Sequence, residues 1–368
     1  MPNPLLALRN LTLKGWRRAS SVHKPFVRGA RRRAREGEKD SVTRDVEEIE
    51  EELAAIAAAG RPIVAGPWLA EVGYEALYWA PFLRWYQDAY RIPRERLTIL
   101  SRGGTRDWYA DFAGGYVEIF DLLTPEALRQ GNDARRAGAE GGGRKQSSAS
   151  PMDEELVRLA RDRQAIGDAV VLHPSLMFRL FRHVWHDALP YDYFWTHTRY
   201  RLIGGPEGPP LLSLDTVPSL PADFSVAKFY SGVAMPADPA TRARLHDLVA
   251  REAAVRPVVM LDTGVAVDEH EDYAFDDIPG VLSARAWMTP ATNLAVQTAL
   301  IARAHTFLTT CGGLAWLGPF LGTPTVAVYA DDKQLAPHLY VARQAGRRLA
   351  AAAFLPLDLR AEATVGRP

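Results

Sequence analysis

The sequence predicts an α/β protein whose two domains face one cleft. Short apolar segments of strand length alternate with helical patterns along most of the 368 residues. Several of these segments run directly into glycine turns, as strands do where a parallel sheet opens toward a ligand. A proline-rich span at residues 204–221 divides the pattern, and a chain of this length has room for two cores.

Composition restricts the class of protein. Hydrophobic residues at 47% and charged residues at 24% are ordinary values for a folded globular protein. Lysine plus arginine equals aspartate plus glutamate at 44 each, so charge does not favour a nucleic-acid partner. The single cysteine, Cys311, excludes an internal disulfide. The start lacks the pattern of a secretory signal, and no run of about 20 apolar residues occurs, so we expect a cytoplasmic protein.

Residues 1–60 are predicted to form a basic tail followed by an acidic amphipathic helix. Residues 14–35 carry nine basic side chains and no acidic one, whereas acidic residues dominate positions 36–52. Apolar residues at positions 42, 46, 49, 53 and 56 form one stripe on a helix that ends at Gly60. The basic block suits a peripheral contact with the inner face of a membrane, and a solvated tail is the alternative.

The first α/β domain is predicted at residues 61–220. Strands are expected at residues 63–65, 97–101 and 169–173, and a helix at 153–164. Another helix is expected from Gly73 or Tyr74 onward, and Pro81 is expected either to kink it or to mark its real first turn. The glycine-rich stretch 131–150 is typical of a flexible insertion. Glu71 and Glu75 follow the first strand, and we expect both carboxylates to face the same opening.

Arginine and aromatic side chains follow the second predicted strand in the run SRGGTRDWY. Arg102, Trp108 and Tyr109 in such a loop suit a sugar or phosphate ligand, and a surface loop is the alternative. His173 ends the third strand and precedes a segment rich in aromatic residues. The histidines at 183, 186 and 197 lack the spacing of a metal site such as H-E-x-x-H, so no metal is predicted.

The second domain is predicted at residues 221–368. Strands are expected at residues 224–230, 258–262, 281–284, 305–310 and 325–329, and helices at 238–254, 291–304 and 314–321. This alternation indicates a Rossmann-like domain. Its acidic loop at 267–277 is expected to be solvated. Gly312 and Gly313 stand at a strand-to-helix turn, where backbone N–H groups bind phosphates, although such glycines also serve packing alone.

The run AHTFLTTCGGLAWLGPFLGTPTVAVY resembles the donor-binding half of GT-B glycosyltransferases, especially the heptosyltransferase-like and fucosyltransferase-like branches. These share an asparagine-led helix, a T-x-G-G or D-S-G turn and a G-x-P-T-V-A-V-Y strand. Asn293, residues 309–313 and residues 322–329 match them here. The run GPWLAEVGYEALYW resembles the loop and helix that present acceptor and catalytic groups in that family. Thr310 and Cys311 depart from the acidic or serine turn, so the resemblance assigns no heptose donor. D-x-D is also missing from the sequence, which favours a metal-independent site.

The resemblance implies sugar transfer from a nucleotide-sugar donor to a hydroxyl of a glycan or polysaccharide, without a metal or another cofactor. The base is expected to be Glu71, with Glu75 as second choice. Donor contacts are expected from Lys228, Arg285, Asn293, Thr310, Gly312 and Gly313, and acceptor contacts from Arg102, Trp108, Tyr109 and His173. Two alternatives stay open, a nucleotide-sugar epimerase and a catalytically inactive glycan-binding scaffold.

Overall fold

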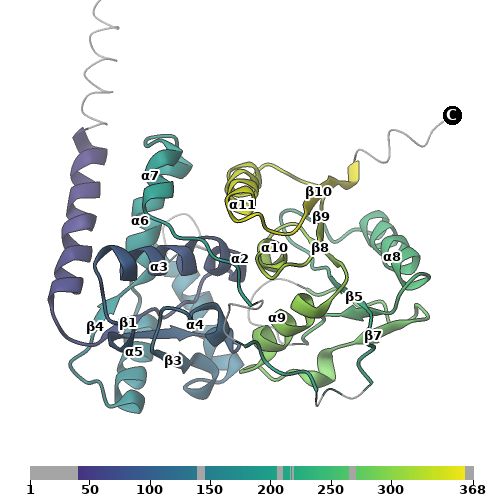
Figure 1. Ribbon diagram of the computed structural model, residues 1–368, viewed down its shortest axis with the longest axis horizontal. Coiled ribbons are helices and arrows are strands. Elements are labelled where there is room, and N and C mark those ends of the chain that lie inside the picture. The colour runs from purple at the N-terminus through teal and green to yellow at the C-terminus, as the bar shows by residue number, and fades with distance from the viewer. Residues whose placement is uncertain are drawn as a thin grey trace, which may run out of the picture.

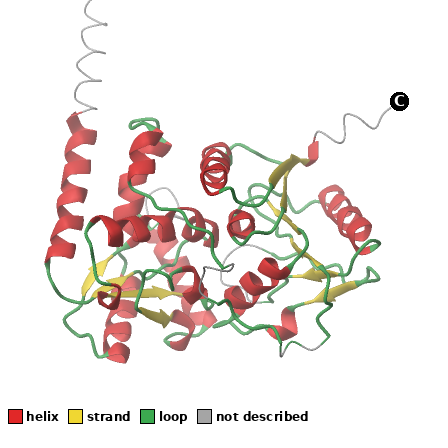
Figure 2. Cartoon of the chain, viewed as in Figure 1, coloured by secondary structure: helices red, strands yellow, loops and turns green. Residues whose placement is uncertain are grey.

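A computed structural model describes residues 40–138, 146–204, 210–215, 217, 219–264 and 271–360. It contains two parallel sheets, one in each half of the chain, with helices around both (Figures 1 and 2). The predicted α/β class with two Rossmann-like halves is confirmed. The basic block at 14–35 lies outside the described residues, so the predicted membrane contact stays a prediction. Among the described helices, none has the length and apolar character needed to cross a membrane.

The first sheet has four strands, of which three were predicted. They are β1 (Ile63–Ala65), β2 (Leu97–Ser101), β3 (Gly115–Glu118) and β4 (Val170–Leu172). The strands lie in the order β3-β2-β1-β4 and every pairing is parallel. All three residues of the central β1 are buried, because helices cover both faces of the sheet.

The helices of this half are α2 (Val72–Tyr74), α3 (Ala80–Ala89), α4 (Pro125–Gly138), α5 (Pro151–Gln164), α6 (Pro174–Trp185) and α7 (Tyr191–Thr196). A π-helix, Glu75–Trp79, joins α2 to α3, and Pro81 stands in the first turn of α3, which is the second of the two positions predicted for it. Pro81 has no N–H to donate to the Leu77 carbonyl, and the Tyr200 hydroxyl donates to that carbonyl instead at 2.5 Å.

The prediction of a flexible insertion at 131–150 is wrong for most of that stretch. Helix α4 continues to Gly138, Gln146 is fully buried, and Ser150 caps α5 through a capping box with Asp153. Composition misled the prediction because the partner of Gln146 lies 77 positions away, at Leu69, where local pattern cannot reveal it. Residues 139–145 lie outside the described part of the chain.

The predicted acidic helix covers residues 40–58 and packs along α6 and α7, as the purple helix of Figure 1 shows. Its predicted apolar stripe is confirmed, since Ile49 and Leu53 are fully buried. The acidic face pairs with the neighbouring helices. Asp45 accepts a hydrogen bond from Arg182 at 2.5 Å and lies 2.7 Å from His183 Nε2.

The second sheet has six parallel strands. They are β5 (Ser225–Lys228), β6 (Val258–Met260), β7 (Val281–Ser283), β8 (Phe307–Thr310), β9 (Thr325–Tyr329) and β10 (Phe354–Asp358). Their order is β10-β9-β8-β5-β6-β7, which is the Rossmann order 3-2-1-4-5-6 read from the other edge. Strand β10 was not predicted, because its sequence FLPLD contains a proline that a strand tolerates only at an edge.

The helices of the second half are α8 (Pro239–Ala253), α9 (Asn293–Arg303), α10 (Leu317–Phe320) and α11 (Ala336–Leu349). Asp238 caps α8 by accepting a hydrogen bond from the Thr241 N–H at 2.8 Å, as its sequence predicts. Helices α9, α10 and α11 lie on the side of the second sheet that faces the first half (Figure 1). Helix α11 was not predicted, although it contributes to the cleft described next.

Candidate active site

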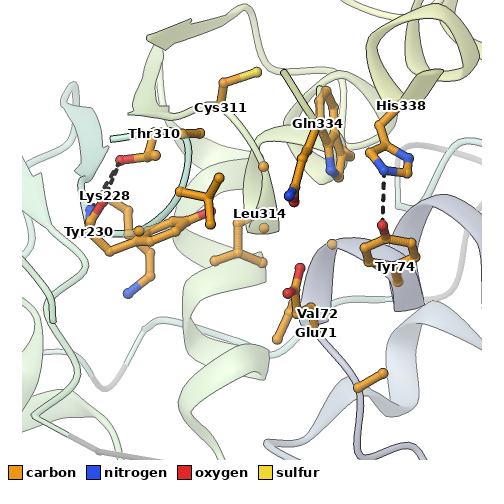
Figure 3. Close-up of a pocket in the computed structure, with 18 of the residues that line it drawn as sticks. Glu71, Val72, Tyr74, Lys228, Tyr230, Thr310, Cys311, Leu314, Gln334 and His338 are labelled. Atoms are coloured by element: carbon orange, nitrogen blue, oxygen red, sulfur yellow. Dashed lines mark hydrogen bonds between the residues drawn. The ribbon is translucent and has the colours of Figure 1, made fainter. Parts of the chain in front are cut away.

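A cleft of about 1060 Å³ lies between the two halves. Its walls come from the loop after β1, from α2 and α6 in the first half, and from the ends of β5 and β8 and from α11 in the second. Figure 3 shows Glu71 and Tyr74 on one side and Thr310, Leu314 and His338 on the other.

The second sheet presents its switch point to this cleft. Strands β5 and β8 are neighbours, and the chain leaves them toward opposite edges, which opens a crevice at their carboxyl ends. Lys228 and Tyr230 stand at the end of β5, and Thr310 stands at the end of β8. The Tyr230 N–H donates to Thr310 Oγ1 at 3.1 Å, which joins the two strand ends.

Gly312 and Gly313 follow β8 with φ values of +123° and +46°. A Cβ added to Gly313 would lie 2.9 Å from the Tyr230 hydroxyl, and a Cβ added to Gly73 would lie 2.8 Å from the Gly313 nitrogen. The contact of Gly313 with Tyr230 lies within the second half, whereas the contact of Gly73 with Gly313 lets the two halves approach closely, which is a packing role. Phosphate binding by their N–H groups stays a prediction.

Lys228 lies in the cleft with an anionic partner. Its ammonium donates to the Leu261 carbonyl at 2.9 Å and pairs with Asp272 at 3.0 Å. Asp272 also accepts from the Thr263 N–H at 3.0 Å. The expectation of a wholly solvated acidic loop is therefore wrong at Asp272, because the buried end of Lys228 attracts its carboxylate. Residues 267–270 of that loop lie outside the described part.

Arg285 and Asn293 also line the cleft. The guanidinium of Arg285, which is 59% exposed, pairs with the buried Asp262 at 2.8 Å. Asn293 begins α9, and its amide donates to the Pro290 carbonyl at 2.5 Å. Arg285 therefore stands on the side where β6 and β7 end.

The structure separates the two predicted carboxylates. Glu71 lines the cleft and its carboxylate is directed toward Gln334 on the opposite wall (Figure 3). Glu75 is fully buried and accepts hydrogen bonds from Ser101 at 2.5 Å and Tyr109 at 2.6 Å. The prediction that both face one opening is wrong for Glu75. Glu71 has extended backbone with ψ of 142°, so helical spacing does not relate the two side chains.

Burial changes the acidity of Glu75. Desolvation raises the pKa of this carboxyl to about 7, while the hydrogen bonds from Ser101 and Tyr109 and the charge of Arg102 lower the pKa by less. Glu75 thus titrates near neutral pH inside the first half. Burial likewise raises the pKa of the Cys311 thiol to about 12, so this cysteine is no thiolate nucleophile at neutral pH.

The loop at 102–109, for which acceptor contacts were predicted, mostly makes contacts inside the protein and between the two halves. Arg102 does line the cleft, but Trp108 and Tyr109 are each 1% exposed and lie inside the protein. Trp108 Nε1 donates to Thr298 on α9 at 3.0 Å. The Gly103 carbonyl accepts from the first N–H groups of α9 at 2.8 and 2.9 Å. The loop sequence could not reveal this partner, which lies about 190 positions away.

His173 is also placed away from the cleft. It caps α6, with Nδ1 accepting from the Ser175 N–H at 3.1 Å, and lies 3.4 Å from Asp153. The first sheet has its own switch point between β1 and β4, where His173 stands. Gln146 and Asp153 fill that crevice, so the acceptor role predicted for His173 does not fit its position.

Sequence reasoning missed His338, which α11 brings to the cleft. Its Nε2 lies 2.9 Å from the Tyr74 hydroxyl and its Nδ1 lies 2.5 Å from the Tyr78 hydroxyl (Figure 3). The two tyrosines come from the first half and their spacing of four in a predicted helix was a signal for a shared face. His338 stands about 260 positions later and gave no such signal.

The described residues contain no cluster of three or more histidine, cysteine or acidic side chains that could hold a metal ion.

No protein-family model and no curated protein matches the chain. Solved structures do resemble it. One is the ADP-heptose lipopolysaccharide heptosyltransferase II of E. coli, with 13% identity, 75% of this chain and 87% of that chain covered, and a TM-score of 0.39.

Two further solved structures resemble the chain. A glycosyl transferase family 9 protein of Veillonella parvula has 13% identity, with 83% of this chain and 88% of that chain covered and a TM-score of 0.38. The glycosyltransferase SnogD of Streptomyces nogalater has 12% identity, with 83% and 98% covered and a TM-score of 0.34. All three are glycosyltransferases, and the first is a heptosyltransferase.

Proposed function

We propose that the chain is a glycosyltransferase that transfers a sugar from a nucleotide-sugar donor to a hydroxyl of a glycan or polysaccharide acceptor, without a metal. One observation carries the proposal. The β5–β8 crevice of a Rossmann-ordered sheet opens into the same cleft as Glu71, which comes from the other half. A nucleotide site and a carboxylate base on opposite walls are what such a transfer requires.

The donor would bind at the ends of β5 and β8. Its diphosphate would contact Lys228, the Thr310 hydroxyl and the N–H groups of the Gly312-Gly313 turn, which offer positive charge and donors without a metal. Lys228 would exchange part of its pairing with Asp272 for the phosphates. Arg285 follows β7 and pairs with Asp262 after β6, which suits the nucleoside rather than the leaving phosphates, and Asn293 lines the same cleft.

The acceptor would bind on the first-half wall. Glu71 would take the proton of the acceptor hydroxyl as its oxygen attacks the sugar carbon and the nucleoside diphosphate leaves. Tyr74, Phe178 and Trp185 line this wall, and aromatic faces suit the apolar faces of sugar rings. Arg182 and His186 extend the wall with polar groups at its edge.

A nucleotide panel tests the donor site. UDP, GDP, ADP, CMP and NAD are each added to the wild type, and thermal unfolding is measured. At 100 times its dissociation constant a bound nucleotide should stabilise the fold by about 2.7 kcal/mol. Lys228→Met should abolish this effect, whereas Glu71→Gln should retain it, because Glu71 stands on the acceptor wall.

Other outcomes select other functions. Stabilisation by NAD alone, or by none of the five, would overturn the donor-site proposal. Nucleotide binding without release of nucleoside diphosphate in the presence of acceptor glycans would favour the inactive glycan-binding scaffold. Interconversion of a bound sugar nucleotide without any acceptor would favour the epimerase.

A further inference from the structure

The connection between β1 and α2, residues 66–71, ends at Glu71 and has no regular secondary structure. Backbone hydrogen bonds from neighbouring strands reach only its first part, where the Gly66 N–H donates to the Leu172 carbonyl at 3.0 Å and the Trp68 N–H to the Leu100 carbonyl at 2.9 Å. Trp68, Leu69 and Ala70 are nevertheless at most 4% exposed. Buried backbone groups need hydrogen-bond partners. Two side chains from other segments, Gln146 and Arg102, supply most of them.

Gln146 uses its whole amide on this connection and its support. Its Oε1 accepts from the Leu69 and Ala70 N–H groups at 2.8 and 3.0 Å. Its Nε2 donates to the Pro67 carbonyl at 2.9 Å and to Asp153 Oδ1 at 3.0 Å. The side chain is fully buried. An amide offers two acceptor positions and two donors, so its capacity is filled.

Asp153 determines the orientation of that amide. It is 1% exposed and sits in the first turn of α5, where it accepts from the Ser150 N–H at 2.7 Å and the Ser150 hydroxyl at 2.5 Å. Because a carboxylate only accepts, Gln146 must turn its NH2 group toward Asp153 and its oxygen toward the connection. The capping box of α5 therefore anchors Gln146.

Arg102 binds the same connection from the end of β2. Its Nη1 donates to the Trp68 carbonyl and its Nη2 to the Ala70 carbonyl, each at 3.0 Å. The guanidinium is a rigid fork, so it fixes the distance between these two carbonyls. Arg102 is 6% exposed and lies beside the residue that precedes Glu71.

We infer that Gln146 and Arg102 are positioning residues for Glu71. Together they bind both N–H groups and two carbonyls around the Leu69–Ala70 step, one residue before the carboxylate that faces the cleft. A base must be held to about 0.5 Å for efficient transfer, and an irregular connection reaches this only through such support. The inference rests on the proposed function for the role of Glu71. The hydrogen bonds by which Gln146 and Arg102 order the connection do not depend on that function.

Amide hydrogen exchange tests, without any substrate, whether Gln146 orders the connection at residues 66–71. Gln146→Leu keeps a similar volume and cannot form the four hydrogen bonds. We expect the Leu69 and Ala70 amides to exchange at least tenfold faster, with unchanged exchange at residues 310–316. The control is Thr323→Val, which removes another buried hydrogen bond, from Thr323 Oγ1 to the Ile301 carbonyl at 2.6 Å in the second half. Equal exchange in Gln146→Leu and wild type would overturn the inference.

A second variant serves if Gln146→Leu does not fold. Gln146→Glu keeps the acceptor oxygens but places a second carboxylate beside Asp153 in place of the donor. Exchange of the two amides, corrected for intrinsic rates, should be faster than in wild type at pH 8. The difference should shrink at pH 5, where the new carboxyl can be protonated and donate. A pH-independent difference would count against the amide's donor role.

Measurements of catalysis test whether the hydrogen bonds of Gln146 affect turnover by positioning Glu71. The readout is release of nucleoside diphosphate from the sugar nucleotide that matches the best-binding nucleotide. Gln146→Leu should lower kcat at least tenfold and leave the nucleotide Kd within twofold. In a Glu71→Gln background it should lower kcat no further. Additive losses would show that Gln146 acts independently of Glu71 and would overturn the positioning role. If no nucleotide binds the wild type, the proposed function fails. The exchange experiment still tests whether Gln146 orders the connection at residues 66–71.

Discussion

At the scale of single residues, Glu75 is a carboxylic acid buried among hydroxyl groups, with a pKa raised to about 7. A raised pKa means that the folded state binds a proton more readily than the unfolded chain, whose carboxyl titrates near 4.5. Its contribution to stability is therefore fully present below pH 4.5 and is lost as pH rises to about 7.

We predict that Glu75→Gln removes this part of the pH dependence. In urea unfolding, the wild type should lose roughly 3 kcal/mol between pH 4.5 and pH 7.5 relative to the variant. The slopes of stability against pH are compared and not the absolute stabilities, because a constant offset between the two proteins does not change the slope. Parallel pH profiles would show that Glu75 is not the titrating group.

Glu71 is the second residue-scale case. Glu71→Gln keeps the size and polarity of the side chain but cannot take a proton, so transfer should fall by about 10² to 10⁴. Nucleotide affinity, measured by calorimetry, should stay as in wild type because the donor crevice is on the other wall. A loss of affinity that equals the loss of turnover would contradict the assignment of Glu71 as base.

At the scale of elements, the helix at 40–58 belongs to the folded core of the first half, because Ile49 and Leu53 have no exposed surface. Leu53→Ala should lower the free energy of unfolding by about 2 to 5 kcal/mol through lost burial and a cavity. The exposed Glu47→Ala on the same helix should change it by less than about 0.5 kcal/mol. Equal effects in urea titrations would mean that the helix does not pack as described.

The π-helix before α3 gives a second element-scale prediction. Tyr200→Phe removes the donor to the Leu77 carbonyl, which Pro81 cannot replace, so unfolding free energy should fall by about 1 to 3 kcal/mol. Pro81→Ala supplies an N–H for that carbonyl. The cost of Tyr200→Phe, measured by chemical unfolding, should therefore be smaller in the Pro81→Ala background. An equal loss of unfolding free energy in both backgrounds would show that the Tyr200 hydroxyl does not replace the N–H that Pro81 lacks.

At the scale of the whole molecule, the two halves meet with backbone against backbone at Gly73 and Gly313. Gly73→Ala places a Cβ 2.8 Å from the Gly313 nitrogen, so the halves should separate at this point and nucleotide affinity should weaken. Small-angle scattering should detect a larger radius of gyration. The matched control is Gly167→Ala, since no atom of the described residues lies within 4 Å of a Cβ there. Identical scattering for both variants would contradict a tight contact.

The sequence by itself determined most of the strands, several helices and the glycine turns, because apolar runs, caps such as Asp238 and breakers such as Pro174 act over a few neighbouring residues. It also indicated that Glu71 follows the first strand and that Lys228 belongs to a strand. Only the tertiary structure decided which side chains reach the cleft. Trp108 binds α9, Gln146 binds the Glu71 connection, and His338 meets Tyr74, in each case through a partner more than 70 positions away. Local pattern carries no information about such partners, since side-chain direction depends on how distant elements pack.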